Sequence, residues 1–494
     1  MKILIISPMF QFNGRKLLQK IRNTIKKHSV IETYYINLGT LYLASIALKR
    51  GHSVFVKVCC KYDFNKIFMT IKPDILLLTA MDIQAQTALY MASQAKLIKP
   101  HTVVIMGGFF PTFRYKEILE KNPDVDFLVI REGEDTFDEL LQFVEGKKKN
   151  KHKIKGIAFL NKKKVVFTGK RDLTNIDKFP FPARFLLKRK VNGIMSSRGC
   201  NYNCKFCCIK NFYHNIRRQR NVKNFIAELQ YLYSQDCSEI KLLDDDFMPT
   251  DVWLSKLSYH INKKRLTKLT FFCLMRLDHF IKKGMIKRLD KLNFFEIAVG
   301  LQNISPEINV YFRTGITKDM IDQFIGILKT RRKIKIKVFY ILNSGRAEES
   351  KKSICNNLTE LLYEITDIKN INVRPFVLTP YSGSDISTNK LFIKKRYSKN
   401  QDFFPTNKVT NKKLTDLYEW FISELKKRGQ YEEPAQTNIV EKVDDVFFFF
   451  TSSLSFQTKI EMLRDAFFWF LYGIVKKQKL NLSIIKERIE NKYF

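Results

Sequence analysis

The sequence has no run of apolar residues long enough to cross a lipid bilayer. The nearest approach, AFFWFLYGIV at 466–475, falls short of the about 18 apolar residues that a membrane span needs. A secretory signal is also missing, because the start, MKILIISPMF, has no long apolar core followed by small residues and is typical of a β-strand. These absences lead us to expect a cytoplasmic protein.

Acidic residues are scarce relative to basic ones. The chain has 48 Asp and Glu against 87 Lys and Arg, which gives a formal net charge of +39. Such a charge is typical of proteins that bind nucleic acid or an anionic membrane. The lysines are spread along the whole chain, however, beside abundant Ile, Asn and Phe, as an AT-rich genome would produce. We favour this compositional explanation and do not expect nucleic acid as a partner.

Cysteine is rare as well, with nine in 494 residues. Without a secretory signal a disulfide framework is disfavoured. Four of the nine nevertheless lie within SSRGCNYNCKFCCIKN, residues 196–211. Cys200, Cys204 and Cys207 have the spacing C-x3-C-x2-C, whereas Cys208 follows directly and is expected to pack as an apolar thiol.

The three spaced cysteines predict a metal site. Three thiolates on one tight loop can hold three irons of a cubane cluster and leave the fourth iron open for an outside ligand. The alternative is a structural zinc site, which needs a fourth ligand such as His214, seven residues after Cys207. Because the loop directly follows the first strand of a β/α series, where functional residues gather, we favour iron and sulfur.

Short apolar strands alternate with helices in two separate series. The first, 1–146, predicts a doubly wound parallel sheet that binds ligands beyond the carboxyl ends of its strands. The second, 191–390, has six β/α units and predicts a partial barrel of parallel strands. A linker with a hairpin (147–190) joins them, and a lysine-rich helical region (391–494) follows. The fold class is therefore α/β with a helical C-terminal region.

The stretch RGCNYNCKFC resembles the signature of the radical S-adenosylmethionine (SAM) enzymes. In that family three cysteines bind a [4Fe–4S] cluster, and SAM chelates the open iron through its amino and carboxylate groups. The resemblance covers about 191–385 and implies that Cys200, Cys204 and Cys207 hold the cluster. It also implies that Phe206, just before the third cysteine, lies near the adenine of SAM.

Further stretches of the second series resemble segments that contact SAM in this family. LLDDDFMPTD (242–251) is similar to the DD-x-F segment of the cobalamin-dependent branch, so Asp244 and Asp245 are expected to accept hydrogen bonds from the SAM ammonium. A carboxylate-rich helix N-terminus is the alternative. Arg276 in MRLD matches an arginine that forks onto the SAM carboxylate, and Gln302 replaces a glutamate that binds the ribose hydroxyls.

The first series resembles the cobalamin-binding domain that precedes the barrel in one large branch of the family. The ordered matches are LGTLYLASIALKRGHSV, PDILLLTAM, VVIMGGFFPTF and VDFLVIREGEDTFDELL. The resemblance implies a cobalamin site at six strand-end residues: Thr79, Gly107, Gly108, Glu132, Gly133 and Glu134. The motif D-x-H-x-x-G, which supplies a lower axial histidine in many cobalamin proteins, is absent, so we expect no histidine ligand to cobalt.

The resemblance implies a reaction as well as cofactors. A reduced cluster passes one electron to SAM, and the resulting 5′-deoxyadenosyl radical abstracts hydrogen from an unactivated carbon, which then takes a methyl group from methylcobalamin. We therefore predict a C-methyltransferase with a small-molecule or lipid substrate and an electron donor such as flavodoxin or ferredoxin. Its catalytic acid or base is not assigned. The alternatives are ring formation or rearrangement without methyl transfer, and a tRNA-modifying or nucleic-acid-binding protein.

The tail contains two aromatic stretches, VFFFFTSSLSF (446–456) and RDAFFWFLYGIVKK (464–477). Apolar residues surround most of the second stretch, which favours a buried helix that caps the barrel. The flanking cations also allow a helix that lies on a membrane surface. Peripheral membrane contact through 446–477 is therefore the alternative expectation.

Overall fold

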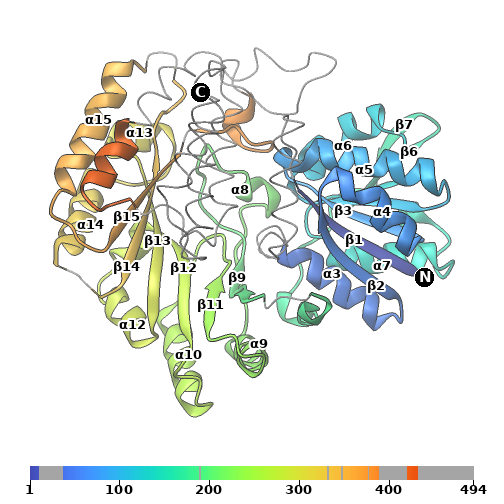
Figure 1. The fold of residues 1–494 in the computed structure, drawn as a ribbon, viewed down its shortest axis with the longest axis horizontal. Coiled ribbons are helices and arrows are strands. Elements are labelled where there is room, and N and C mark those ends of the chain that lie inside the picture. Colours follow the sequence, from blue (N-terminus) through green and yellow to red (C-terminus); the bar gives the residue numbers. More distant parts are fainter. Residues whose placement is uncertain are drawn as a thin grey trace, which may run out of the picture.

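The computed structural model describes most of the two predicted α/β domains (Figure 1). The described residues are 1–9, 37–187, 191–330, 333–346, 349–376, 378–388 and 420–431. The predicted membrane-contact segment 446–477 lies outside them, as does most of the helical region 391–494. In the described part of the chain, no helix has the length and apolar character needed to span a bilayer.

The first domain is built on a seven-stranded sheet with the order β2-β1-β3-β4-β5-β6-β7. The first five strands are parallel, as expected for a doubly wound sheet, and the hairpin β6–β7 is added antiparallel to β5. The hairpin of the predicted linker therefore extends this sheet. The strands are β1 (Lys2–Pro8), β2 (Ser53–Cys59), β3 (Ile75–Thr79), β4 (Val103–Gly107), β5 (Phe127–Val129), β6 (Ile157–Asn161) and β7 (Lys164–Phe167).

Helices cover both faces of this sheet, and each face forms its own hydrophobic core. One face carries α3 (Leu38–Lys49) and α7 (Glu134–Val144), and the other carries α4 (Lys61–Ile71), α5 (Ala85–Ile98) and α6 (Phe109–Lys121). Helix α4 was not predicted from the sequence, and it buries residues spaced four and three apart: Phe64, Phe68 and Ile71.

Helix α6 begins earlier than predicted. The predicted helix covers 116–122 and follows a loop, whereas α6 starts at Phe109, directly after Gly108. Pro111 lies in the first turn, where the missing backbone N–H costs no intrahelical hydrogen bond. The loop after β4 is consequently very short.

The second domain contains the six parallel strands that the sequence predicts, in the sequential order β8-β11-β12-β13-β14-β15. The strands are β8 (Gly193–Ile194), β11 (Glu239–Leu242), β12 (Thr270–Arg276), β13 (Phe294–Gln302), β14 (Lys335–Ile341) and β15 (Ile371–Phe376). The helices are α9 (Val222–Ser234), α10 (Asp251–Lys263), α11 (Leu277–Phe280), α12 (Met285–Lys291), α13 (Pro306–Tyr311), α14 (Lys318–Thr330) and α15 (Lys351–Glu364). Their apolar faces and the strands form one large core.

Two predicted elements of this domain are divided. The strand expected over 193–197 becomes β8 and a second short strand, β9 (Ser197–Arg198), which pairs with β10 (Arg218–Gln219) instead of the barrel. The helix expected over 280–292 becomes α11 and α12, because Gly284 between them adopts a φ of 77°. The β9–β10 pair encloses the cysteine stretch and the short helix α8 (Ile209–Phe212), which lies between the two domains (Figure 1).

Candidate functional site

The three spaced cysteines lie on the loop between β9 and α8, at the carboxyl-end side of the barrel strands. Gly199 starts this loop with a φ of 85°, and a Cβ there would collide with the carbonyl of Ile216. The Gly199 N–H donates to Asp245 Oδ2 (2.8 Å), which ties the loop to the end of β11. The backbone therefore requires glycine directly before the first cysteine.

The three thiols lie close enough together on the loop to influence one another's pKa. Burial raises the pKa of Cys200 to about 11 and raises that of Cys207 further, with contributions from the neighbouring thiols. Such thiols bind as thiolates only to a cation that replaces their protons. Among the described residues no set of three or more Cys, His, Asp or Glu converges closely enough for a single metal ion. Three thiols on one loop are the donor set of a cluster in which each thiol binds a different iron, so the donor chemistry fits a cluster.

His214, the fourth ligand of the zinc alternative, has a cationic environment. Burial together with Arg131 and Lys170 lowers its pKa, and its backbone is in the left-handed region with a φ of 55°. The structure therefore gives the zinc alternative no support.

A tyrosine inside the cysteine loop fastens the loop to the end of β12. Tyr202 Oη donates to Asp278 Oδ2 (2.7 Å) and lies 2.9 Å from His279 Nε2. Arg276 stacks its guanidinium on the Tyr202 ring at 3.5 Å from the ring centre, and its Nη1 lies 3.5 Å from Cys204 Sγ. Arg276 was predicted at this site, whereas Tyr202 and its partners were not.

The Arg276 guanidinium already has partners within the protein. Nε donates to Asp278 Oδ1 (3.0 Å) and Nη2 donates to the Thr314 carbonyl (2.5 Å). Its predicted contact with the SAM carboxylate stays a prediction, and the structure adds the positioning of the cysteine loop as a role.

Three consecutive aspartates follow β11, and each has a different environment. Asp244 is fully used: it accepts hydrogen bonds from Ser196 N (2.6 Å), Ser196 Oγ (2.5 Å) and Ser197 Oγ (2.5 Å). Asp245 supports Gly199, and burial raises its pKa to about 6. The predicted contacts of Asp244 and Asp245 with SAM stay predictions.

The third aspartate, Asp246, was not among the predicted site residues. Its Oδ1 accepts a hydrogen bond from the backbone N–H of Arg276 (3.0 Å). Its Oδ2 is buried without a hydrogen-bond partner, 3.6 Å from His279 Nε2, and burial raises the pKa of Asp246 to about 6. A buried acid with a raised pKa beside a cysteine loop is typical of functional sites. In the sequence, its place as the third residue of the DDD run could have indicated that Asp246 belongs to the site.

Gln302 and Phe206 lie at the same end of the barrel. Gln302 ends β13 with a φ of 64°, an uncommon conformation for a residue other than glycine, and a Cβ on Gly300 would collide with its side chain. Phe206 packs edge-on against Phe312 (ring centres 5.2 Å apart) in a small apolar cluster with Leu378. Phe206 thus lies on the cysteine loop and Gln302 at the carboxyl end of β13, and their contacts with adenine and ribose stay predictions.

The predicted cobalamin residues lie together at the carboxyl ends of β3, β4 and β5. Gly108 has a φ of 106°, and a Cβ there would stand 2.8 Å from the Ala80 carbonyl and 3.1 Å from Thr79 Oγ1. Gly108 therefore lets two strand ends approach closely, whereas a Cβ on Gly107 would make ordinary contacts. Gly133 precedes α7.

Two buried polar atoms without partners lie at this sheet edge, Ser7 Oγ at the end of β1 and Arg131 Nη1 after β5. Unsatisfied polar atoms at the carboxyl edge of a doubly wound sheet fit the site of a ligand.

Glu132 and Glu134 bind arginines of the barrel domain. Arg198 Nη1 lies 2.7 Å from Glu134 Oε1 and 3.0 Å from Glu132 Oε1, and Arg218 Nη2 donates to Glu132 Oε1 at 2.6 Å. The Arg198 side chain is buried between the rings of Tyr42 and Phe179. We call this set of ion pairs the arginine clamp. The carboxylates of Glu132 and Glu134 bind the clamp arginines. Their predicted contacts with cobalamin stay predictions.

Other contacts join the two domains next to the clamp. Asp82, after β3, accepts hydrogen bonds from the backbone N–H of Ser382 (3.2 Å) and from its hydroxyl. Phe109 of α6 packs against Phe212 of α8 with ring centres 4.5 Å apart. The carboxyl-end loops of the first domain therefore face the cysteine loop region of the second.

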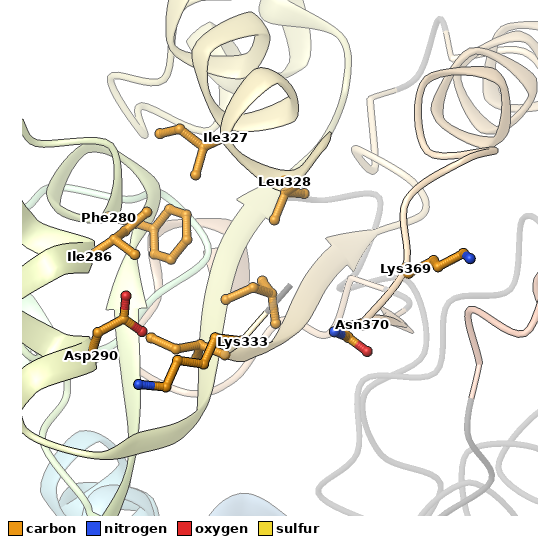
Figure 2. A pocket seen from close by; sticks show the side chains of 10 residues that line it. Phe280, Ile286, Asp290, Ile327, Leu328, Lys333, Lys369 and Asn370 are labelled. Carbon is orange, nitrogen blue, oxygen red and sulfur yellow. The ribbon is translucent and has the colours of Figure 1, made fainter. Parts of the chain in front are cut away.

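A cavity elsewhere in the barrel does not belong to this site (Figure 2). It has a volume of about 20 Å³ and is lined by side chains such as Phe280, Leu328 and Lys333. Asn370 directly precedes β15, so the cavity lies at the amino-terminal end of the strands. Barrels of this kind carry function at the opposite end.

The fold and site together define a two-domain α/β enzyme with a cysteine loop at its domain junction. Comparisons with known proteins agree with this class. The family model of the B12 binding domain matches residues 29–141, and that of the radical SAM superfamily matches residues 194–354. The chain therefore carries a B12-binding domain followed by a radical SAM domain, over the residues that the two models match.

Individual relatives extend the likeness over both domains. The chain is 28% identical over 400 residues to the uncharacterized methyltransferase PH0819 of Pyrococcus horikoshii, covering 78% of this chain and 82% of that protein. It is 23% identical over 301 residues to the anaerobic magnesium-protoporphyrin IX monomethyl ester cyclase of Synechocystis, covering 58% of each. The radical SAM methyltransferase TsrM of Kitasatospora setae, solved with cobalamin and a [4Fe–4S] cluster, has a similar fold, with a TM-score of 0.60 at 14% identity, covering 78% of this chain and 74% of that one.

These findings confirm the predicted fold class and the predicted enzyme class. They also confirm cobalamin and SAM as the cofactors of the two matched domains. The roles of individual residues stay predictions, and the structure adds Tyr202, Asp246 and Arg198 to them.

Proposed function

We propose that this enzyme transfers a methyl group to an unactivated carbon of its substrate, using cobalamin, SAM and a [4Fe–4S] cluster. When bound, the cluster and SAM supply the 5′-deoxyadenosyl radical, and cobalamin carries the methyl group. The relative that covers most of the chain has a methyltransferase name, which supports the proposal.

The arginine clamp is the observation that carries this proposal. In a methyl transfer of this kind, cobalamin and the SAM-derived radical must both react at the same substrate carbon. Their binding sites must therefore face each other at a fixed distance. Arg198 lies two residues before Cys200, and its guanidinium binds Glu132 and Glu134 on a loop at the predicted cobalamin edge. The clamp therefore holds the two predicted cofactor sites against one another.

The chain's own residues have complementary tasks in this proposal. Cys200, Cys204 and Cys207 hold the cluster, while Tyr202 and Asp245 fix the loop that carries them. The apolar wall of Phe206 and Phe312 keeps water from a reactive radical. Thr79 and Gly108 shape the edge where cobalamin binds.

Product analysis tests the proposal. Purified, anaerobically reconstituted enzyme is incubated with SAM, a reductant and candidate substrates, and the nucleoside products are quantified. Methylation by this route yields 5′-deoxyadenosine and S-adenosylhomocysteine in equal amounts, and Cys200→Ala abolishes both. Full conversion of substrate with deoxyadenosine alone would rule out methyl transfer.

That second outcome would support ring formation or rearrangement, the second candidate function. The relatedness to the cyclase of Synechocystis favours it, since that enzyme is named for a ring closure. The same assay therefore separates the two candidates.

The surroundings of the enzyme are part of the proposal. All nine cysteines are free of disulfides, which suits the reducing cytoplasm. An electron donor such as flavodoxin or ferredoxin would reduce the cluster, and the substrate would be a small molecule or a lipid.

A further inference from the structure

Arg217 lies close to the cysteine loop without an acidic side chain at ion-pair distance among the described residues. Four neighbouring arginines do bind an acid: Arg198 and Arg218 bind the clamp glutamates, Arg220 binds Glu228 at 2.6 Å, and Arg276 binds Asp278 at 3.0 Å. Within the described residues, Arg217 forms no ion pair, and its Nη2 donates only to the neutral Gln219 Oε1 (2.5 Å).

Burial makes this lack of a partner costly. Arg217 Nε is buried and has no hydrogen-bond partner, and burial lowers the pKa of the guanidinium. The carboxylates of Asp244 and Asp246 oppose this effect, so the guanidinium lies near the end of β11 to which the cysteine loop is tied. A buried guanidinium N–H without an acceptor lowers the stability of the fold unless an oxygen of a ligand accepts its hydrogen bond.

The guanidinium is also held in place. Gln219 Nε2 donates to the Ser196 carbonyl (2.8 Å), and Ser196 in turn donates to Asp244. Arg217 is thus connected through Gln219 to the strand that leads into the cysteine loop. A charged group fixed by its neighbours before the ligand arrives is typical of a binding site.

We propose that Arg217 binds an anionic oxygen group, a carboxylate or a phosphate, presented next to Cys200. The planar guanidinium, with Nε and one Nη available, matches the two oxygens of such a group. Two molecules can bring this chemistry: SAM through its carboxylate, or an acidic substrate. This inference rests on the proposed function only in taking the cysteine loop as the reaction site.

The experiment measures binding without turnover, on anaerobically reconstituted holoenzyme. Wild type, Arg217→Gln and Arg217→Lys are titrated with SAM, decarboxylated SAM and inorganic phosphate, and the dissociation constants are determined. Arg265→Gln is the matched control, because Arg265 is exposed at the end of α10. Iron content and thermal unfolding verify that each variant keeps its cluster and fold.

Two outcomes support the inference and identify the source of the anion. If SAM supplies it, Arg217→Gln weakens SAM binding about 10- to 100-fold, and leaves binding of decarboxylated SAM unchanged. If an acidic substrate supplies it, SAM binding is unchanged, while phosphate binds wild type and not Arg217→Gln. Arg217→Lys keeps the positive charge but not the planar guanidinium, so it should lose less binding affinity than Arg217→Gln. It also allows the test to be made if Arg217→Gln loses its cluster.

Unchanged binding of SAM together with equal or absent phosphate binding by wild type and both variants would overturn the inference. This failure is distinct from failure of the proposed function. An enzyme that binds the anion through Arg217 but forms no methylated product would refute methyl transfer alone.

Discussion

Two acidic loops of this protein look alike in sequence but are used differently. The loop Arg131–Glu134 follows β5 of the first domain, and Asp244–Asp246 follow β11 of the barrel. Both place carboxylates at the carboxyl end of a parallel strand, and both were predicted to bind a cofactor. In the first loop the acids pair with arginines of the other domain, whereas the second loop has no arginine or lysine ion pair within the described residues.

The two loops differ in the groups that stabilise their buried carboxylates. The clamp arginines neutralise Glu132 and Glu134, so these acids serve to join the domains. Hydroxyl and backbone donors surround Asp244 to Asp246, which is too little to prevent burial from raising the pKa of Asp245 and Asp246 to about 6. A buried carboxylate whose charge is not compensated is a better candidate for function than a carboxylate already paired with an arginine.

Removal of Asp244 is expected to have the largest effect on the barrel loop. Asp244→Ala leaves the buried Ser196 N–H without an acceptor and releases both serine hydroxyls, a loss of about 3–5 kcal/mol of unfolding free energy. Chemical denaturation and the iron content after reconstitution measure it. Asp322→Ala, at an exposed position of α14, is the control. Full iron content in Asp244→Ala would contradict its anchoring role.

Removal of the clamp tests the first loop. Arg198→Met leaves Glu134 buried without its cation, so we expect a loss of about 3 kcal/mol in the stability of the domain junction. Limited proteolysis and denaturation measure the change, and iron content separates it from damage to the cysteine loop. Glu134→Gln, which retains a hydrogen-bond acceptor, should lose less. If Arg198→Met resists proteolysis as wild type does, the clamp is not what holds the domains.

Asp246→Asn sharpens the comparison, because it should stabilise the protein while it impairs the reaction. A folded-state pKa of about 6, above the usual value, means that the acid contributes stability below its unfolded pKa and that this contribution is lost as pH rises through about 6. The variant should therefore match wild type near pH 4 and exceed it by about 1–3 kcal/mol at pH 7.5. Denaturation at several pH values measures this difference. A variant that is less stable than wild type at pH 7.5 would show that the charged carboxylate of Asp246 stabilises the fold.

Ser382→Ala is expected to have the smallest effect on stability. It tests Asp82, an acidic residue that follows the carboxyl end of β3. It removes the hydroxyl that donates to Asp82 but keeps the backbone donor, so we expect a loss of about 1 kcal/mol. Because burial already raises the pKa of Asp82 and Ser382 opposes that shift, the loss should be greater at pH 8 than at pH 5. Thermal unfolding at the two pH values tests this. A loss independent of pH would mean that Asp82 is not charged at the interface.

Much of the architecture could be predicted from the sequence because it depends on local patterns. Continuous apolar strands such as Ile3–Ile6 are buried on both faces of a sheet, and their alternation with helices requires a parallel arrangement. The predictions were wrong where the sequence pattern is weaker. Helix α4 was not predicted, and Pro111 led us to place the start of α6 too late. Proline is usually a helix breaker, and only its place in the first turn makes it compatible.

The cysteine spacing by itself determined that three thiols share one loop, since residues so close in sequence cannot separate far in space. It likewise determined the class of enzyme, because the motif and the β/α series occur together. The tertiary structure alone decided which charges meet. Glu132 is 66 residues from Arg198, and Asp82 is 300 residues from Ser382, so no local pattern could pair them. Nor could it show that Arg217 Nε and Asp246 Oδ2 are buried without a hydrogen-bond partner, because burial is a property of the folded chain.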